Sequence, residues 1–282
     1  MANITQAREL LVSRLLQGDG HSSPGERRAA FNNVGLGPPM SALVDKVVND
    51  AAGVSADDIK AATQSGLTED QIFELVVCAA VGEADRQYSV VLAILDSGHS
   101  FKTKMLFALI RAASRQPTPE PLKLMKYRPD FFGGPMQKLM QEAMRGASTW
   151  SVADRELVAA VISEANRCDY CARAHAAVAA LAYCDDAKTV AVLANLESAP
   201  IEPPLRAILR MLAKLTINHT ISADDLRSVL VAGASREQIK DALAVCFALN
   251  VIDRLANAFA FVIPGREAFE AGAKFLLARG YS

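Results

Sequence analysis

Apolar residues recur at intervals of three and four along most of the chain, and no long stretch alternates with a period of two. A helix with 3.6 residues per turn gives this spacing when one of its faces is buried, whereas a half-buried strand gives alternation. Ala, Leu, Val, Glu, Lys and Arg dominate the sequence. The pattern therefore predicts an all-α protein.

Several predicted helices begin at a Ser or Thr that is followed three positions later by Asp or Gln, which is the spacing of a capping box. These pairs are Ser55 with Asp58, Thr68 with Gln71, Ser151 with Asp154, Ser222 with Asp225, and Ser235 with Gln238. Segments rich in Gly and Pro predict breaks between helices. They fall at residues 18–25, 35–39, 116–121, 133–135 and 200–204.

One stretch of the sequence occurs twice. Residues 55–59 (Ser-Ala-Asp-Asp-Ile) match residues 222–226 (Ser-Ala-Asp-Asp-Leu), and after a shift of one residue Cys78, Asp85 and Arg86 match Cys246, Asp253 and Arg254. Such internal similarity indicates an incomplete tandem duplication. We expect a degenerate first copy in residues 1–116 and a second copy in residues 117–282, and the Cys-x-x-Cys motif occurs in the second copy alone.

The amino-acid composition limits the classes of protein to which this chain can belong. The chain has 282 residues, of which 51% are hydrophobic, so it can bury a sizeable core. The 30 basic and 31 acidic residues are interspersed, and this balance argues against binding to nucleic acid or to an anionic membrane. We found neither a signal-peptide pattern nor an apolar run of about 18 residues, so we expect a cytoplasmic protein. Five scattered cysteines do not resemble a secreted disulfide framework.

The strongest chemical signal is a run that contains Cys168, Cys171 and His175. On a helix these side chains project from one face, and Cys171 and His175 are neighbours one turn apart. A carboxylate could orient the imidazole. Glu164 would share the thiol face of a continuous helix, whereas Glu156 reaches the site only if the helix breaks near Asn166 to Arg167. Asn166 would then cap a helix whose first turn contains Cys168.

Glu156, eleven residues, Cys168-x-x-Cys171, three residues and His175 form a pattern of fixed spacing. With it, the sequence resembles the carboxymuconolactone decarboxylase and alkylhydroperoxidase D-like (AhpD-like) superfamily. Segments 127–131 and 248–256 add to the resemblance, which covers residues 120–262 and, as a partial copy without the motif, residues 38–100. Tyr170 departs from the pattern, because alkylhydroperoxidase D has His between its cysteines.

The resemblance implies an AhpD-like helical fold and a thiol-dependent peroxidase or disulfide oxidoreductase that cycles between a dithiol and a Cys168–Cys171 disulfide. It also implies a dithiol reductant, such as a lipoyl protein, thioredoxin or glutathione, and assembly into trimers or hexamers, with a dimer as an alternative. The family spacing favours Glu156 over Glu164. We predict a relay from Glu156 through His175 to Cys171, with Cys168 as the more exposed, attacking sulfur.

Two other functions remain open, a decarboxylase-type lyase that uses acid and base residues, and a noncatalytic helical oligomer. We expect no cofactor. We also expect no metal, because the two cysteines and one His on the same helix give three ligands, whereas structural zinc sites use four.

Simpler interpretations apply to the remaining candidate residues. Cys78, Cys184 and Cys246 are expected in the core, and His21, His99 and His219 at the surface or in helix caps. Asp253 and Arg254 could face the site or pair between helices, and the second interpretation is favoured because Asp85 and Arg86 repeat them in the copy without the motif. Asn250 lacks such a counterpart, and this favours a role in the site. Trp150 and Tyr170 are expected to be packing residues.

Overall fold

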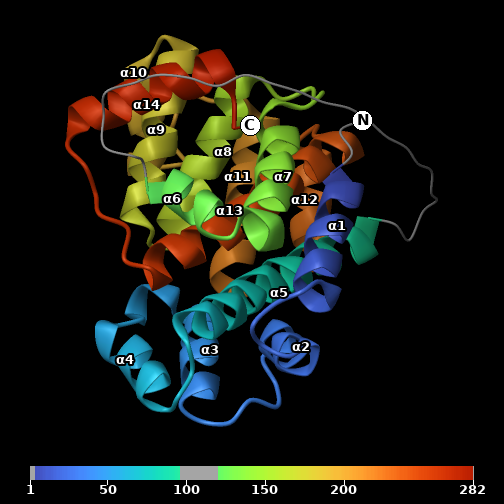
Figure 1. Ribbon diagram of the computed structural model, residues 1–282. Helices are drawn as coiled ribbons and strands as arrows, with labels where there is room; N and C mark the ends of the chain where they lie inside the picture. Colours follow the sequence, from blue (N-terminus) through green and yellow to red (C-terminus); the bar gives the residue numbers. More distant parts are fainter. Residues whose placement is uncertain (1–3, 96–119, 282) are drawn as a thin grey trace.

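The computed structural model describes residues 4–95 and 120–281, and in these ranges it consists of helices without a strand (Figure 1). The predicted all-α class is therefore confirmed. In chain order the helices are α1 (Ile4–Gln17), α2 (Pro24–Asn32), α3 (Met40–Asn49), the 3-10 helix η1 (Ala51–Gly53), α4 (Ala56–Gln64), α5 (Glu69–Leu95), α6 (Glu120–Tyr127), the π-helix η2 (Pro129–Gly133), α7 (Gly134–Arg145), α8 (Val152–Ala165), α9 (Asp169–Tyr183), α10 (Asp186–Ala194), α11 (Pro203–Asn218), α12 (Ala223–Val231), α13 (Arg236–Ala258) and α14 (Arg266–Arg279).

All the predicted capping boxes are present. The Ser residues before α4, α8, α12 and α13 each accept from the backbone N–H three positions on, and the residue there bonds back. Thr68 and Gln71 make the same pair of bonds at the start of α5. Within the break predicted at residues 133–135, η2 ends at Gly133 and α7 begins at Gly134, with no non-helical residue between the two helices. His99 and most of the predicted domain boundary at 116–121 lie outside the described residues, so the division into two domains stays a prediction.

Helix α13 forms the centre of the core. It is buried along almost its whole length, and it packs against α5, α7, α8 and α11 (Figure 1). A helix that is buried on all sides is covered in this way by its neighbours. In the ranges 4–95 and 120–281, no helix combines the length and the apolar character needed to cross a lipid bilayer.

The two similar sequence segments form helix groups with the same local contacts. Lys46 on α3 pairs with Asp58 at the start of α4, and Lys214 on α11 pairs in the same way with Asp225 at the start of α12. The long helix that follows, α5 in one copy and α13 in the other, packs against its counterpart. Figure 1 shows α2 to α5 together in the lower part of the view and the second copy above them.

The copies differ at the position that holds Asn250 in α13 and Gly82 in α5. A Cβ atom added at Gly82 would lie 1.9 Å from the backbone oxygen of Phe31, because α2 crosses α5 at this point. Arg86 donates a hydrogen bond to the same oxygen at 2.7 Å. In the first copy, helix α2 therefore occupies the space beside α5. The equivalent space beside α13 in the second copy holds polar side chains of the candidate site.

Candidate active site

The site is built around a sharp break between α8 and α9. Helix α8 ends at its C-cap Asn166, Arg167 takes a left-handed conformation with φ of 54°, and Cys168 is the N-cap of α9. The backbone N–H of Cys168 donates to the carbonyl of Ser163 at 2.9 Å. Asn257 on α13 donates to the carbonyl of Asn166 at 3.2 Å. These contacts fix the two helices at an angle.

This break changes the expected role of Asn166. The residue does not cap α9, and Cys168 lies at the cap itself instead of within the first turn. The side-chain amide of Asn166 turns toward α13, where it donates to Asp253 at 2.9 Å and to Asn250 at 3.2 Å. Local sequence placed the break correctly but could not show which helix the amide would meet.

The sulfur atoms of Cys168 and Cys171 lie close together and are reduced. Cys171 makes hydrogen bonds to Cys168 and to Asp253, and the two sulfurs and a carboxylate oxygen of Asp253 all lie within 4.8 Å of one another. The bond to Cys168, burial and the bond to Asp253 together raise the pKa of Cys171 well above its usual value. Cys171 therefore holds its proton in the resting dithiol.

The expectation that Cys168 is the more exposed sulfur is wrong. Cys168 is 1% exposed and Cys171 is 2% exposed, because the junction of α8 and α9 packs directly onto α13. Tyr170, which lies between them in the sequence, packs edge-on against Phe261 and Phe269, as a packing residue should. The thiols thus lie buried in the core, and the expected hollow open to water is not formed around them.

Asp253 pairs between helices, as expected, and it also reaches the thiols. Its completely buried carboxylate on α13 accepts from Ser163 on α8 at 2.9 Å, from Asn166 at 2.9 Å and from the thiol of Cys171 on α9. Burial raises its pKa to about 6, although these hydrogen bonds oppose the rise. Its counterpart Asp85 pairs with Arg8, so the repeat indicated the pairing between helices but not the contact with a thiol.

Glu156 and His175 meet as the family spacing requires. Oε2 of Glu156 lies 2.7 Å from Nδ1 of His175, whereas Glu164 is exposed to solvent. Glu156 is itself fully buried and accepts from Arg145 at 2.7 Å and from the hydroxyl of Tyr281 at 2.9 Å. Burial alone would raise the pKa of Glu156, but His175 and Arg145 outweigh it and lower that pKa.

The last contact of the predicted relay, from His175 to Cys171, is absent among the described residues. His175 lies one turn after Cys171 on α9, but among the residues described its hydrogen bonds reach Glu156 and Tyr281 and neither thiol. Because Nδ1 faces the Glu156 carboxylate, we assign the ring proton to Nδ1, which leaves Nε2 as the basic nitrogen. The catalytic roles of Glu156, Cys168, Cys171 and His175 stay predictions.

Other expected residues fall both inside and outside the site. Asn250 is buried, as a site role would require, and donates to the sulfur of Cys246 at 3.2 Å. His219 does cap α11, but it also contacts Glu83 at 2.6 Å, a partner from the other copy that the local sequence concealed. Cys184 is exposed rather than in the core, since it follows the end of α9.

Three further expectations agree with the structure. Cys78 and Cys246 are buried. Trp150 packs in the core, where its ring N–H donates to the carbonyl of Gln238 at 2.8 Å. His21 lies near the surface, 3.7 Å from Asp70.

A comparison with models of protein families gives a match within the second copy. Residues 132–214 match the model of the carboxymuconolactone decarboxylase family. The resemblance inferred from the motif is thereby confirmed for this segment, which includes Glu156, Cys168, Cys171 and His175.

Two solved structures are similar to the chain. An uncharacterized peroxidase-related protein from Silicibacter sp. is 26% identical, with a TM-score of 0.45 over 49% of this chain and 71% of that one. An uncharacterized peroxidase-related protein with an alkylhydroperoxidase AhpD core, from Ralstonia eutropha, is 20% identical, with a TM-score of 0.49 over 67% of this chain and 90% of that one. A search of curated proteins gave no match.

Proposed function

We propose that this protein is a thiol-dependent oxidoreductase in which Cys168 and Cys171 alternate between a dithiol and a disulfide. The observation that carries the proposal is the hydrogen-bonded group of two thiols and the Asp253 carboxylate at the break between α8 and α9. Two thiols whose sulfurs lie within 4.8 Å of each other can form a disulfide with little movement of the backbone. A buried carboxylate with a pKa of about 6 can accept and return a proton near neutral pH.

In the first step, the thiolate of Cys168 attacks the terminal oxygen of a hydroperoxide. Cys168 lies at the N-terminus of α9, where the positive end of the helix dipole stabilises negative charge. The O–O bond breaks, Cys168 becomes a sulfenic acid, and the alcohol leaves. Asp253 takes the thiol proton of Cys168 and returns it to the departing alkoxide, so the carboxylate is regenerated.

In the second step, the sulfur of Cys171 attacks the sulfur of the sulfenic acid. The S–O bond breaks and the disulfide forms, while Asp253 accepts the proton of Cys171 and supplies it to the leaving hydroxide. In total, one hydroperoxide and two thiols give one alcohol, one water and one disulfide. The Glu156–His175 pair supplies a second basic nitrogen one turn away on α9.

Burial of the two thiols limits which substrates and which reductants can reach them. With Cys168 at 1% and Cys171 at 2% exposure, a small hydroperoxide can reach the sulfurs more readily than the disulfide of a folded protein. A dithiol must afterwards reduce the Cys168–Cys171 bond by exchange. A lipoyl group, thioredoxin and glutathione are the candidates, and the slim lipoyl arm suits a buried disulfide best. A homo-oligomer is part of this proposal, and sedimentation would measure its size.

A thiol titration tests the proposal. The background variant carries Cys184→Ser, because this exposed thiol would react without any active site. A stoichiometric dose of a small alkyl hydroperoxide should consume two thiols, and mass mapping should find them joined between residues 168 and 171. Cys171→Ser should stop at a sulfenic acid on Cys168, and Cys168→Ser should not react. An unchanged thiol titre in the background variant would contradict the proposal.

The family name favours a second candidate, a decarboxylase-type lyase. Glu156, His175 and Asp253 could serve as acid and base groups in such a reaction without any sulfur chemistry. An absorbance assay with a muconolactone substrate tests this directly. Turnover that survives in a Cys168→Ser, Cys171→Ser double variant would favour the lyase over the oxidoreductase.

A further inference from the structure

Arg254, next to Asp253 on α13, is a buried cation that is only half satisfied. The residue is 4% exposed, and its Nη1 donates to Asn250 Oδ1 at 2.6 Å, to the Asn250 carbonyl at 2.9 Å and to Asn166 Oδ1 at 3.4 Å. In the described part of the chain, neither Nε nor Nη2 makes a hydrogen bond, and no carboxylate forms an ion pair with this guanidinium. Buried charges are usually paired, because removing them from water is costly.

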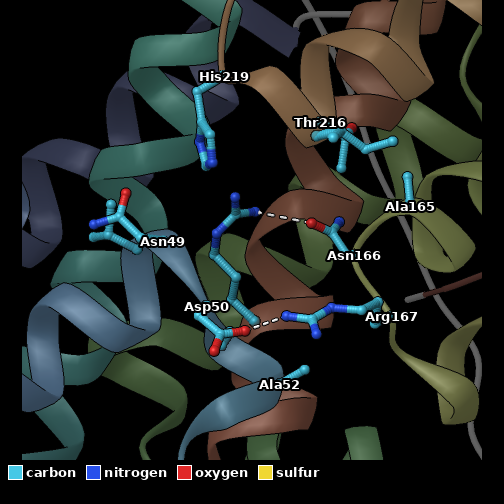
Figure 2. Close-up of a pocket in the computed structure, with 12 residues that line it drawn as sticks. Asn49, Asp50, Ala52, Ala165, Asn166, Arg167, Thr216 and His219 are labelled. Carbon is cyan, nitrogen blue, oxygen red and sulfur yellow. Dashed lines mark hydrogen bonds and ion pairs between the residues drawn. The ribbon is translucent and has the colours of Figure 1, made fainter.

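The guanidinium lines a cavity of about 190 Å³ where the two copies meet. Figure 2 shows Asn49 and Asp50 from the first copy on one side and Asn166 and Arg167 from the second copy on the other. Arg254 lines this cavity, and its Nε and Nη2 have no hydrogen-bond partner among residues 4–95 and 120–281, so these donors are available to a molecule in the cavity.

The acidic groups around the cavity are already paired. Asp50 forms an ion pair with Arg167, which Figure 2 shows as a dashed line. Glu83 contacts His219 at 2.6 Å and accepts from Arg86 at 2.9 Å. The unpaired charge at the cavity is therefore positive and belongs to Arg254.

We propose that this cavity binds a small monocarboxylate, with its two oxygens on Nε and Nη2 of Arg254. These two N–H groups lie on one edge of the planar guanidinium and point in parallel, which matches the two oxygens of a carboxylate. Val48, Ala165 and Ile217 also line the cavity and offer apolar surface to a short hydrocarbon body. The cavity offers the one unpaired positive charge of Arg254, because Asp50 and Arg167 neutralise each other, so a monoanion fits better than a phosphate.

Butanoate is a suitable probe, and butanamide is its neutral control of the same shape. At constant ionic strength, butanoate should raise the melting temperature of the full-length wild-type protein with increasing concentration, and butanamide should not. Line broadening of carboxyl-labelled butanoate gives the affinity. Arg254→Gln should weaken binding by about tenfold or more, the loss expected for a charge-assisted pair of hydrogen bonds.

Because Arg254 is buried, Arg254→Gln could fail to fold, and Ala52→Trp provides a second test at an exposed residue of the cavity lining. The bulky ring should fill the cavity and abolish butanoate binding while the protein stays folded. Equal binding of butanamide, affinity unchanged in the folded variants, or absence of binding at millimolar butanoate would each overturn the proposal. None of these outcomes depends on the thiols, so the test is independent of the proposed oxidoreductase activity.

Discussion

The carboxylate of Asp253 accepts a hydrogen bond from the thiol of Cys171, although one residue lies on α13 and the other on α9. This contact joins the Cys-x-x-Cys motif to the central helix of the fold. It also provides the thiol pair with a proton acceptor within the same buried space.

Asp253→Asn should slow conversion of the dithiol to the disulfide by about 100-fold, because loss of a positioned acid-base group typically costs this much. The rate profile should also lose the inflection near pH 6 that the carboxylate gives to the wild type. Rapid quenching with an alkylating reagent and mass mapping measures the rate. Asp85→Asn, at the matching position of the first copy, should leave the rate and profile unchanged. An equal effect of both substitutions would contradict a role for Asp253 in the chemistry.

Asp253 also predicts how stability depends on pH. Its pKa of about 6 in the folded protein exceeds the ordinary 3.8, so the folded state holds the proton more tightly than the unfolded chain does. The stability contributed by this group is fully present below about pH 4 and is lost as the pH rises through about 6. Relative to wild type, the free energy of unfolding of Asp253→Asn should therefore rise by up to about 3 kcal/mol from pH 4 to pH 7. Urea unfolding over this range measures it, and a difference that does not vary with pH would exclude the shift.

Glu156→Gln should have the opposite pH dependence. The pKa of Glu156 is lowered in the folded protein, so its contribution is present above its unfolded pKa and is lost as the pH falls through the folded one. At neutral pH the substitution should cost about 3 kcal/mol, because Arg145 loses its buried carboxylate partner. Chemical unfolding measures the loss. Glu164 is exposed and was the alternative carboxylate for orienting His175. Its substitution Glu164→Gln should change the free energy of unfolding by less than about 0.5 kcal/mol. Equal losses in the two variants would refute the buried network.

Gly82→Ala should destabilise the first copy by about 3 kcal/mol or more, since the new methyl group would meet the backbone of Phe31 at 1.9 Å. Gly272→Ala is the matched control, because it lies within α14 and its Cβ would have no neighbour within 4 Å. The control should be stabilised by about 0.5–1 kcal/mol through helix propensity. Thermal unfolding compares the two. A tolerated Gly82→Ala would mean that α2 does not cross α5 this closely.

The sequence by itself determined the features that depend on neighbouring residues. Apolar spacing defined the helices, Ser and Thr marked their starts, and the spacing of Glu156, Cys168, Cys171 and His175 indicated the family whose model matches residues 132–214. Each of these signals involves residues that lie close together in the sequence, so the local sequence is sufficient to predict these features.

The tertiary structure alone decided which side chains complete the site. Packing of α13 against the junction of α8 and α9 buried both thiols and brought Asp253 to Cys171, although the first copy suggested a structural role for that residue. The same packing turned Asn166 toward α13 and left half of the Arg254 guanidinium facing a cavity between the copies. Burial and partners of this kind depend on helices far apart in the chain, and no local pattern encodes which of them will meet.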